Sequence, residues 1–364
     1  MSYLDRVTAM LDEIRAQQRY RELPLRQLSG VLDFSSNDYL GLAGDPQVVE
    51  ALKRADRAGS GGARLLGGRH REHSLLEEEL AEWLGRERAI LFSSGYLAAL
   101  GAIPVLAELG DVVLSDRLNH ASIVDGVRLA RVPRTIYEHG SPPAAERRRA
   151  LIVTETIFSM GGDGIDAAAL LTSRSADDVV IFDEAHALGV AGAEGAGIAR
   201  PLRDPRVVVL GTLSKALGAH GGFIAGPAAV VELLVNRART FIFDTALPPA
   251  LALAARIGLI LARRADDRRA RLHANAARLR DGLVAKGARL PHPAGAIVPL
   301  LLGREDEAMR VSARLMERKI YVPAIRPPTV PPGTARLRIS VRADHTLDQI
   351  DRLVEEVGPC IATS

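Results

Sequence analysis

Short apolar segments alternate with helix-like segments between Pro46 and about Phe241, and this alternation constrains the fold more than any other feature of the sequence. Each apolar segment is hydrophobic on both faces and is bounded by Gly, Asp or Ser, as the strands of a covered parallel sheet are. The clearest candidate strands are Ala89–Phe92, Val112–Leu114, Leu151–Thr154, Val179–Phe182, Val207–Gly211 and Phe223–Gly226. The pattern predicts an α/β domain with a mostly parallel sheet and helices on both faces.

The segments on either side of this alternation have a different pattern. Apolar spacing predicts a helix near the N-terminus, and a short extended segment, Leu32–Phe34, follows it. After Leu247, long Ala-, Leu- and Arg-rich helices precede a mixture of short strands and helices. We therefore expect an N-terminal arm over 1–45, a large α/β domain over 46–245 and a small α+β domain over 246–364.

The composition argues against several classes of protein. The chain has 364 residues, of which 47% are hydrophobic and 25% charged, as in ordinary globular proteins. A formal net charge of +3 with dispersed arginines gives no reason to expect nucleic acid as a partner. Cys360 is the only cysteine, so no intrachain disulfide can form and no metal site is predicted. No apolar run reaches about 18 residues, so we expect no membrane contact and a cytoplasmic location.

The run Asp183-Glu184-Ala185-His186 directly follows a predicted strand, where α/β folds present functional side chains. In a nucleoside triphosphatase such a run binds magnesium, but the phosphate-binding loop G-x-x-x-x-G-K-[ST] that this function requires is absent. A second interpretation places the Asp183 carboxylate on a buried pyridine nitrogen, so that a protonated ring withdraws electrons from a carbanion. His186 could then hydrogen-bond the ring's phenolic oxygen. The simpler alternative is a helix cap at Asp183 and a polar loop residue at His186.

Lys215 lies just after another predicted strand, among small and hydroxyl-bearing residues. A buried ammonium group is costly unless it has a partner or a chemical task, and the other lysines lie in charged helical patterns. Lys215 is therefore the candidate for a Schiff base with a cofactor. Thr212 and Ser214 beside it could bind a phosphate, although hydroxyls near a strand end often make only local hydrogen bonds.

A phosphate could also be bound where Ser94, Gly95 and Tyr96 connect a predicted strand to a helix. The first backbone N–H groups of a helix bind anions, but this kind of connection is common in α/β proteins.

Two further side chains have open alternatives. His120 follows the predicted strand Val112–Leu114 and could stack on a flat cofactor, or it could be structural. Arg338 lies inside a short strand, where a guanidinium group requires a carboxylate partner. Arg336 points to the same face of that strand, so the spacing alone does not choose between the two arginines.

Taken together, these motifs resemble the α-oxoamine synthases, a family of fold-type-I pyridoxal-phosphate enzymes. The resemblance covers essentially the whole chain, and its segments follow one another in the family's order. They are Phe34–Gly41, Gly59–Gly62, Asn119–Ser122, Glu155–Asp163 and the segments around Asp183 and Lys215. The resemblance implies the fold-type-I architecture, bound pyridoxal 5'-phosphate and a homodimer.

Carried over position by position, the resemblance implies roles for individual residues. Lys215 would carry the cofactor and act as acid and base, Asp183 would contact the pyridine nitrogen, and His120 would stack on the ring. The other cofactor contacts would be His186, Ser94, Gly95, Tyr96, Ser159, Thr212 and, from the neighbouring subunit, Thr245. The substrate side would be formed by Arg21, Asn37, His120, Thr329 and Arg338, with Arg338 binding the amino acid's carboxylate. Ser94 and Tyr96 depart from the Cys and Phe that other members often carry.

The segment Ala324–Pro331, followed by Gly333–Arg338, resembles the members that condense L-alanine with a pimeloyl thioester in biotin biosynthesis. The acyl group could be carried by coenzyme A or by a carrier protein. One alternative is a sister enzyme that uses glycine or serine with another acyl-CoA. The other is a non-catalytic regulator that binds pyridoxal phosphate, but the arm before Phe34 is too short for the DNA-binding module that such a protein carries.

Overall fold

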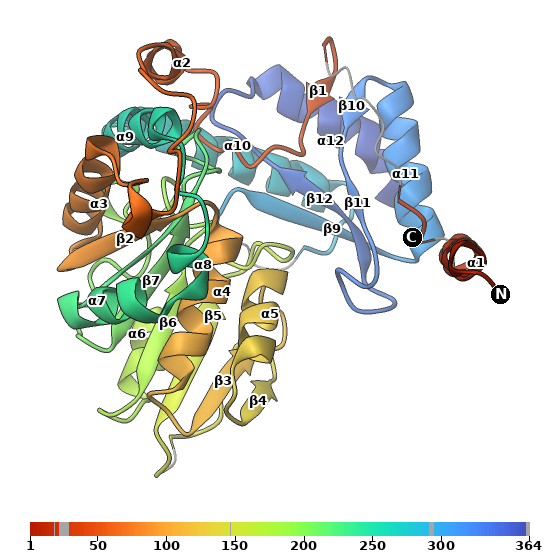
Figure 1. Ribbon diagram of the computed structural model, residues 1–364. Helices are drawn as coiled ribbons and strands as arrows, with labels where there is room; N and C mark the ends of the chain where they lie inside the picture. Colours follow the sequence, from red (N-terminus) through yellow and green to blue (C-terminus); the bar gives the residue numbers. More distant parts are fainter. Residues whose placement is uncertain (18, 22–28, 146, 291–294, 362–364) are drawn as a thin grey trace.

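The structure is a computed structural model, and it describes residues 1–17, 19–21, 29–145, 147–290 and 295–361. Figure 1 shows a large sheet region built from the middle of the chain and a smaller region built from its C-terminal third. The N-terminal helix α1 (Tyr3–Ala16) lies outside both and buries none of its residues. No helix among the described residues is both long and apolar enough to span a bilayer.

A seven-stranded sheet forms the centre of the large region, with the strand order β2-β8-β7-β6-β5-β3-β4. Only β8 runs antiparallel to its neighbours β2 and β7, and the other adjacent pairs are parallel. The strands are β2 (Arg88–Phe92), β3 (Val112–Asp116), β4 (Arg134–Tyr137), β5 (Ala150–Glu155), β6 (Val179–Asp183), β7 (Val207–Thr212) and β8 (Gly222–Gly226). The predicted α/β class and the mostly parallel sheet are confirmed.

The central strands are apolar up to their polar last residues because they contribute to two hydrophobic cores. Along β6, Val180 and Phe182 pack into one buried cluster, whereas Ile181 between them packs into the other. This alternation is expected for a sheet with helices on both faces. Strand β4 was not predicted, since three of its four residues are exposed and it lacks an apolar run.

Helices cover both faces of this sheet. On one face lie α4 (Gly95–Ala107), α5 (Ala121–Leu129), α7 (Ala228–Arg237) and α8 (Arg239–Ile242). On the other lie α3 (Arg71–Leu84), α6 (Ala167–Thr172) and α9 (Pro249–Arg263), with α2 (Pro46–Lys53) packed against α9. Two short 3₁₀ helices, η1 (Arg64–Leu66) and η2 (Ala193–Gly195), complete the region.

The C-terminal region has a three-stranded antiparallel sheet in the order β11-β12-β9. Its elements are α10 (Asp266–Ala285), β9 (Ile297–Gly303), α11 (Glu305–Glu317), β10 (Ile320–Tyr321), β11 (Ala324–Ile325), β12 (Ala335–Ser340) and α12 (Leu347–Ile361). Strand β1 (Leu32–Asp33) pairs in parallel with β10, so the N-terminal arm is joined to this region. Helix α9 follows residue 245 but packs against α2 and α3, and the three-part division at 45 and 245 stays a prediction.

The topology places the ends of several strands side by side. Strands β3, β5, β6 and β7 are parallel neighbours, and they end at Asp116, Glu155, Asp183 and Thr212. The carboxyl edge of such a sheet is where α/β folds bind ligands. Strand β12 also reaches this edge, because the Arg338 side chain donates a hydrogen bond to the carbonyl oxygen of Ser159.

Candidate active site

Lys215 and His186 meet at the carboxyl edge of the sheet. Lys215 follows β7 and is half-buried, and its Nζ lies 2.8 Å from Nε2 of the buried His186, which follows β6. Burial lowers the pKa of Lys215 to about 8, although the negative charges of Asp183 and Glu155 oppose that shift. Burial and the charge of Lys215 hold the pKa of His186 well below its usual value. At neutral pH the pair therefore contains a neutral imidazole and an amine close to its titration point.

Two buried carboxyl groups lie beneath this pair. Asp183 and Glu155 end adjacent strands and face each other in the sheet register. Asp183 accepts a hydrogen bond from the Ala185 N–H at 2.9 Å, and Glu155 accepts from the N–H groups of His120 at 2.7 Å and Ser159 at 3.1 Å. Burial, together with the charge of Asp183, raises the pKa of Glu155 to about 8, and burial also raises that of Asp183.

Asp183 and Glu155 have no ion-pair partner within the described part of the chain. A buried carboxylate without a cation is costly, and such groups are retained mainly where they have a chemical task. Because a pKa of about 8 leaves Glu155 largely protonated at neutral pH, Asp183 is the carboxylate that a cationic group on a ligand can neutralise.

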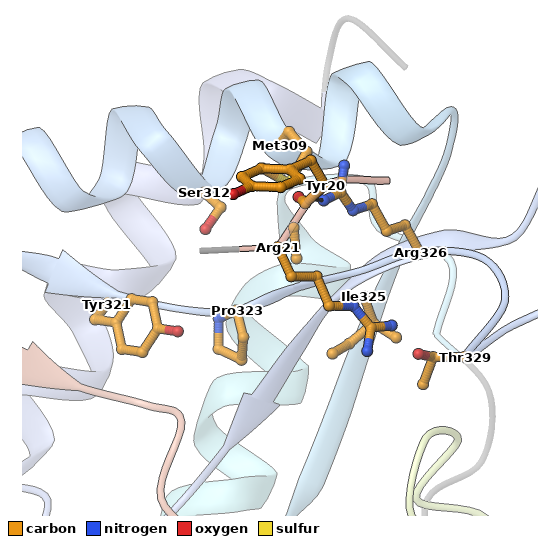
Figure 2. Close-up of a pocket in the computed structure, with 10 residues that line it drawn as sticks. Tyr20, Arg21, Met309, Ser312, Tyr321, Pro323, Ile325, Arg326 and Thr329 are labelled. Atoms are coloured by element: carbon orange, nitrogen blue, oxygen red, sulfur yellow. Dashed lines mark hydrogen bonds between the residues drawn. The ribbon is translucent and has the colours of Figure 1, made fainter. Parts of the chain in front are cut away.

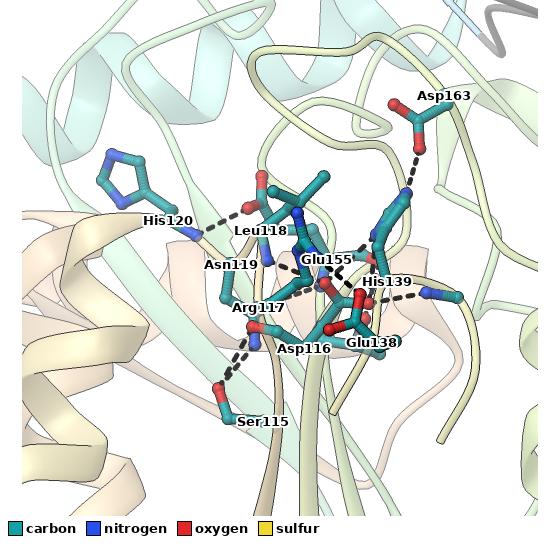
Figure 3. Close-up of polar contacts among 12 residues, drawn as sticks. Ser115, Asp116, Arg117, Leu118, Asn119, His120, Glu138, His139, Glu155 and Asp163 are labelled. Carbon is teal, nitrogen blue, oxygen red and sulfur yellow. Dashed lines mark hydrogen bonds and ion pairs between the residues drawn. The ribbon is translucent and has the colours of Figure 1, made fainter. Parts of the chain in front are cut away.

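His120 is the exposed member of the cluster. Its backbone N–H binds Glu155, and Ser122 donates its own N–H to His120 Nδ1 at 3.2 Å. Figure 3 shows the imidazole ring directed away from the neighbouring Asp116 and His139 cluster. The backbone is therefore fixed while one face of the ring remains free for a flat ligand.

The start of α4 lies beside the end of β7 and forms a candidate anion site. Ser94 caps the helix by accepting the Leu97 N–H at 3.2 Å. A Cβ on Gly95 would lie 3.2 Å from Thr212 Cβ, so a larger residue would crowd the strand. The Thr212 and Ser214 hydroxyls are 2.7 Å apart. Helix N–H groups and hydroxyls together suit a phosphate. Tyr96 is exposed at this position, and its hydroxyl donates to Asp125.

Arg338 connects the C-terminal region to this site. It is 5% exposed and donates to the Ser159 carbonyl at 2.6 Å, to Asn37 Oδ1 at 3.0 Å and to Ser340 Oγ at 2.7 Å. Arg336, the alternative left open by the spacing, instead donates to the carbonyl of Met160 at 3.2 Å. Arg338 is therefore the arginine that the structure brings together with Asn37 and Ser159.

Arg21 and Thr329 lie elsewhere, in a cavity of about 580 Å³ between the N-terminal arm and the C-terminal region. Figure 2 shows the Arg21 side chain extending past Ile325 towards Thr329, whereas the Arg326 side chain runs towards Tyr20. Arg326 donates to the Tyr20 carbonyl at 3.2 Å. This cavity presents two guanidinium groups, and neither Asn37 nor Arg338 lines it.

Thr245 is exposed, and its carbonyl accepts a hydrogen bond from Ser93 Oγ at 3.0 Å. An isolated β-bridge joins it to Ala63. Its side chain therefore lies at the surface near the candidate anion site, and the structure does not bring it into the Lys215 cluster.

Two residues without a predicted role belong to the cluster. Glu155 orients His120 and Ser159, and its position at the end of an apolar strand, like that of Asp183, is a signal that could have identified it. Tyr39 is 1% exposed, and its Oη lies 2.7 Å from His186 Nδ1. Tyr39 lies in the segment Phe34–Gly41 that resembles the family, but nothing in the sequence indicates its contact with His186, which is 147 positions away.

These side chains fit pyridoxal phosphate. The group needs an amine of lowered pKa, an acidic partner for its pyridine nitrogen, a flat neighbour and an anion site. Lys215, Asp183 and His120 meet the first three needs, and the start of α4 meets the fourth. Asp183 is buried, lies near the charge of Lys215 and forms no direct ion pair among the described residues, and this is the observation that fits the cofactor best.

Comparisons with known proteins agree with this geometry. The family model described as aminotransferase class I and II matches residues 29–357. The 8-amino-7-oxononanoate synthase of Methylococcus capsulatus is 45% identical over 96% of this chain and 97% of that protein.

Two solved structures extend the comparison. A variant of serine palmitoyltransferase from S. paucimobilis, with a bound PLP–myriocin aldimine, superposes with a TM-score of 0.89 at 28% identity, over 100% of this chain and 99% of that one. The 8-amino-7-oxononanoate synthase from Francisella tularensis gives a TM-score of 0.80 at 29% identity, over 92% and 99%. The predicted fold-type-I architecture and the resemblance seen in the motifs are confirmed. The chain belongs to the aminotransferase class I and II family of pyridoxal-phosphate enzymes and, within it, to the family of the 8-amino-7-oxononanoate synthases.

Proposed function

We propose that this chain is a pyridoxal-phosphate-dependent acyltransferase of biotin biosynthesis. It condenses L-alanine with a pimeloyl thioester and releases 8-amino-7-oxononanoate, CO2 and a free thiol. The observation that carries the proposal is the meeting of Lys215, His186 and Asp183 at one edge of the sheet. The names of relatives that are 38–45% identical support the choice of product.

Bound at this edge, pyridoxal phosphate supplies an electron sink for the negative charge that develops at the amino acid's Cα. Asp183 is the residue to hold a proton on the pyridine nitrogen, because a buried carboxylate is stabilised by a cation next to it. His120 covers the ring, and His186 contacts its phenolic oxygen. Ser94, Gly95, Tyr96, Ser159 and Thr212 make the remaining contacts to the cofactor.

Lys215 carries the cofactor and moves the proton at Cα. A pKa of about 8 leaves a useful fraction of free amine at neutral pH, as a general base requires. Arg338 binds the carboxylate of L-alanine, and Asn37 beside it helps to orient that group. Lys215 first removes the Cα proton and, after the loss of CO2, returns a proton to the same carbon.

The cavity with Arg21 and Thr329 is our candidate for the acyl chain. A pimeloyl group ends in a carboxylate, and the guanidinium groups of Arg21 and Arg326 line the same cavity of about 580 Å³. A long apolar acyl chain would find these two groups unfavourable. This favours a pimeloyl donor, on coenzyme A or on a carrier protein, over the long-chain acyl-CoA that a sister enzyme could use.

We also propose that the enzyme is a cytoplasmic homodimer. Leu65, Leu66 and Phe243 are 53%, 83% and 68% exposed, and they lie in segments close to Thr245. A second copy covering them would bury apolar surface and place its own Thr245 near the phosphate site. Light scattering on the purified protein tests the oligomeric state.

The first experiment records the near-ultraviolet and visible absorbance of the purified protein and then follows thiol release with L-alanine and pimeloyl-CoA. We expect a visible cofactor band that Lys215→Ala abolishes, and thiol release that needs both substrates. Thiol release only with glycine or serine and another acyl-CoA would assign the chain to a sister enzyme. A protein that forms no band with added pyridoxal phosphate would refute the proposal.

A further inference from the structure

The Tyr39 hydroxyl belongs to the Lys215 cluster, and the proposed function gives it no role. Tyr39 is buried, and its Oη lies 2.7 Å from His186 Nδ1 and 3.2 Å from Asn37 Oδ1. His186 in turn contacts Lys215, and Asn37 contacts Arg338. The hydroxyl therefore stands at the middle of a hydrogen-bonded chain that runs from the lysine to the arginine.

The arginine end of the chain has a fixed direction. Arg338 Nη1 lies 3.0 Å from the Asn37 side chain, and a guanidinium group can only donate, so the amide oxygen of Asn37 must face it. Tyr39 must then donate its proton to the same oxygen. This leaves only the lone pairs of Tyr39 Oη for the contact with His186.

The lysine end gives the same direction independently. An ammonium group has no acceptor, so Lys215 Nζ donates to His186 Nε2 at 2.8 Å and that nitrogen carries no proton. The pKa of His186 lies well below its usual value, since burial and the charge of Lys215 disfavour the imidazolium, so the ring has one proton to place. That proton is on Nδ1, where it is donated to Tyr39.

We propose that Tyr39 is a positioning residue that keeps the proton of His186 on Nδ1, so that Nε2 presents its lone pair to Lys215. Hydrogen bonds thereby connect the reacting amine of Lys215 to Arg338 at the carboxylate subsite. In this chain His186 accepts from Lys215 and donates to Tyr39, and Tyr39 donates to Asn37. The inference rests on the proposed function for the role of Lys215 as the reacting amine, whereas the tautomer can be measured without turnover.

Loss of this hydroxyl has a defined consequence. If the proton of His186 moved to Nε2, that N–H would be donated to the free amine of Lys215 and would occupy the lone pair with which the amine acts as a base. Arg338 would lose its interaction with the Tyr39 hydroxyl but would keep its bonds to Ser159, Asn37 and Ser340, so the carboxylate subsite would be preserved. We therefore expect Tyr39→Phe to affect turnover and not the binding of L-alanine.

The decisive measurement is the tautomer of His186 in the cofactor-free protein, by long-range ¹H–¹⁵N correlation on a ¹⁵N-histidine sample. Nine histidines contribute signals, and His186→Asn identifies the relevant one by its loss. We expect the Nδ1–H pattern in the wild type and, above pH 8, where Lys215 is mostly a free amine that can accept a hydrogen bond, a shift towards Nε2–H in Tyr39→Phe. The matched control is Tyr137→Phe, which removes another buried hydroxyl, one that bonds Thr154 outside this chain of contacts. It should leave the His186 signal unchanged.

The second measurement uses the cofactor-loaded enzyme. Tyr39→Phe should lower kcat about tenfold, as removal of a partner that orients a functional histidine does, with KM for L-alanine unchanged. An Nε2–H pattern in the wild type overturns the inference even if the variant does not fold. A variant with wild-type tautomer and kcat also overturns it. A wild type that releases no thiol but has the Nδ1–H tautomer would refute the proposed function and leave this inference standing.

Discussion

Two clusters of charged side chains lie at the same edge of the large sheet, and they differ in how their charges are paired. In the first, His139 bridges two aspartates: Nδ1 lies 3.1 Å from Asp116 Oδ1, and Nε2 lies 2.6 Å from Asp163 Oδ2 (Figure 3). In the second, the carboxyl groups of Asp183 and Glu155 accept hydrogen bonds from backbone N–H groups, and no cation of the described residues forms an ion pair with them. The first cluster pairs its charges with each other, whereas the second leaves the Asp183 carboxylate available to a cationic group of a ligand.

The pKa shifts of the two clusters have opposite causes. The hydrogen bonds that His139 donates to Asp116 and Asp163 raise its pKa to about 10, so the fold stabilises that charge. Burial raises the pKa of Glu155 to about 8 and lowers that of Lys215 to about 8, so the fold resists those charges. A charge that the fold stabilises contributes to stability, whereas a charge that it resists is kept at a cost and marks the reactive site.

The largest effect should come from Lys215→Ala. We expect turnover to fall about 10³-fold or more and the visible cofactor band to vanish, because the substitution removes both the attachment point and the base. The cofactor-free variant should be as stable as the wild type in urea unfolding, since a desolvated ammonium group is removed. If the free energy of unfolding instead fell by about 2 kcal/mol, the charge of Lys215 would stabilise the fold, as that of His139 does.

Asp183→Asn should have the next largest effect, a fall in turnover of about 10²-fold. The amide keeps the size of the side chain but provides no negative charge to hold a proton on the ring nitrogen. Cofactor retention after gel filtration and thiol release are the measurements. The matched variant is Asp116→Asn in the paired cluster, which should lower stability more than Asp183→Asn does. The reverse order of stabilities would contradict the distinction between the clusters.

The lowered pKa of Lys215 predicts how cofactor uptake depends on pH. Only the free amine can form the bond, so the rate should rise about tenfold per pH unit below pH 8 and level off above it. Stopped-flow absorbance after mixing cofactor-free protein with pyridoxal phosphate measures this rate. A rate that continued to rise to about pH 10, the value of an ordinary lysine, would show that the site does not resist the charge.

The sequence predicted best what is encoded locally. Strands β6 and β7 are continuous apolar runs that pack into both cores, so the apolar pattern alone places Asp183 and Lys215 at strand ends. Strand β4 was missed because its residues are mostly exposed. Asp183 and Lys215 could be proposed from the sequence because apolar strands precede them, whereas several of their partners have no such local pattern.

Long-range contacts account for most of what was missed. Asn37 and Arg338 are 301 residues apart and meet because β1 pairs with β10 in the C-terminal region, a pairing that no local pattern encodes. Tyr39 lies in a recognised motif, but its contact with His186 exists only in the folded chain. His139 was not singled out, because its two aspartates come from different segments: Asp116 ends β3, and Asp163 lies in the loop after β5.

His139→Gln should give the smallest effect, a loss of about 1 kcal/mol in the free energy of unfolding near neutral pH. The folded pKa of about 10 lies above the unfolded value of 6.5, so this stabilisation is fully present below pH 6.5 and is lost as the pH rises through 10. Urea unfolding of the wild type and the variant across this range measures the difference. If the difference did not change with pH, His139 would act through its packing on Phe158, whose ring centroid is 4.3 Å away, and not through its charge. A difference that shrinks towards pH 10 would show that Asp116 and Asp163 stabilise the positive charge of His139. Asp183 has the opposite effect on Glu155, because its negative charge disfavours the ionised form of that neighbour.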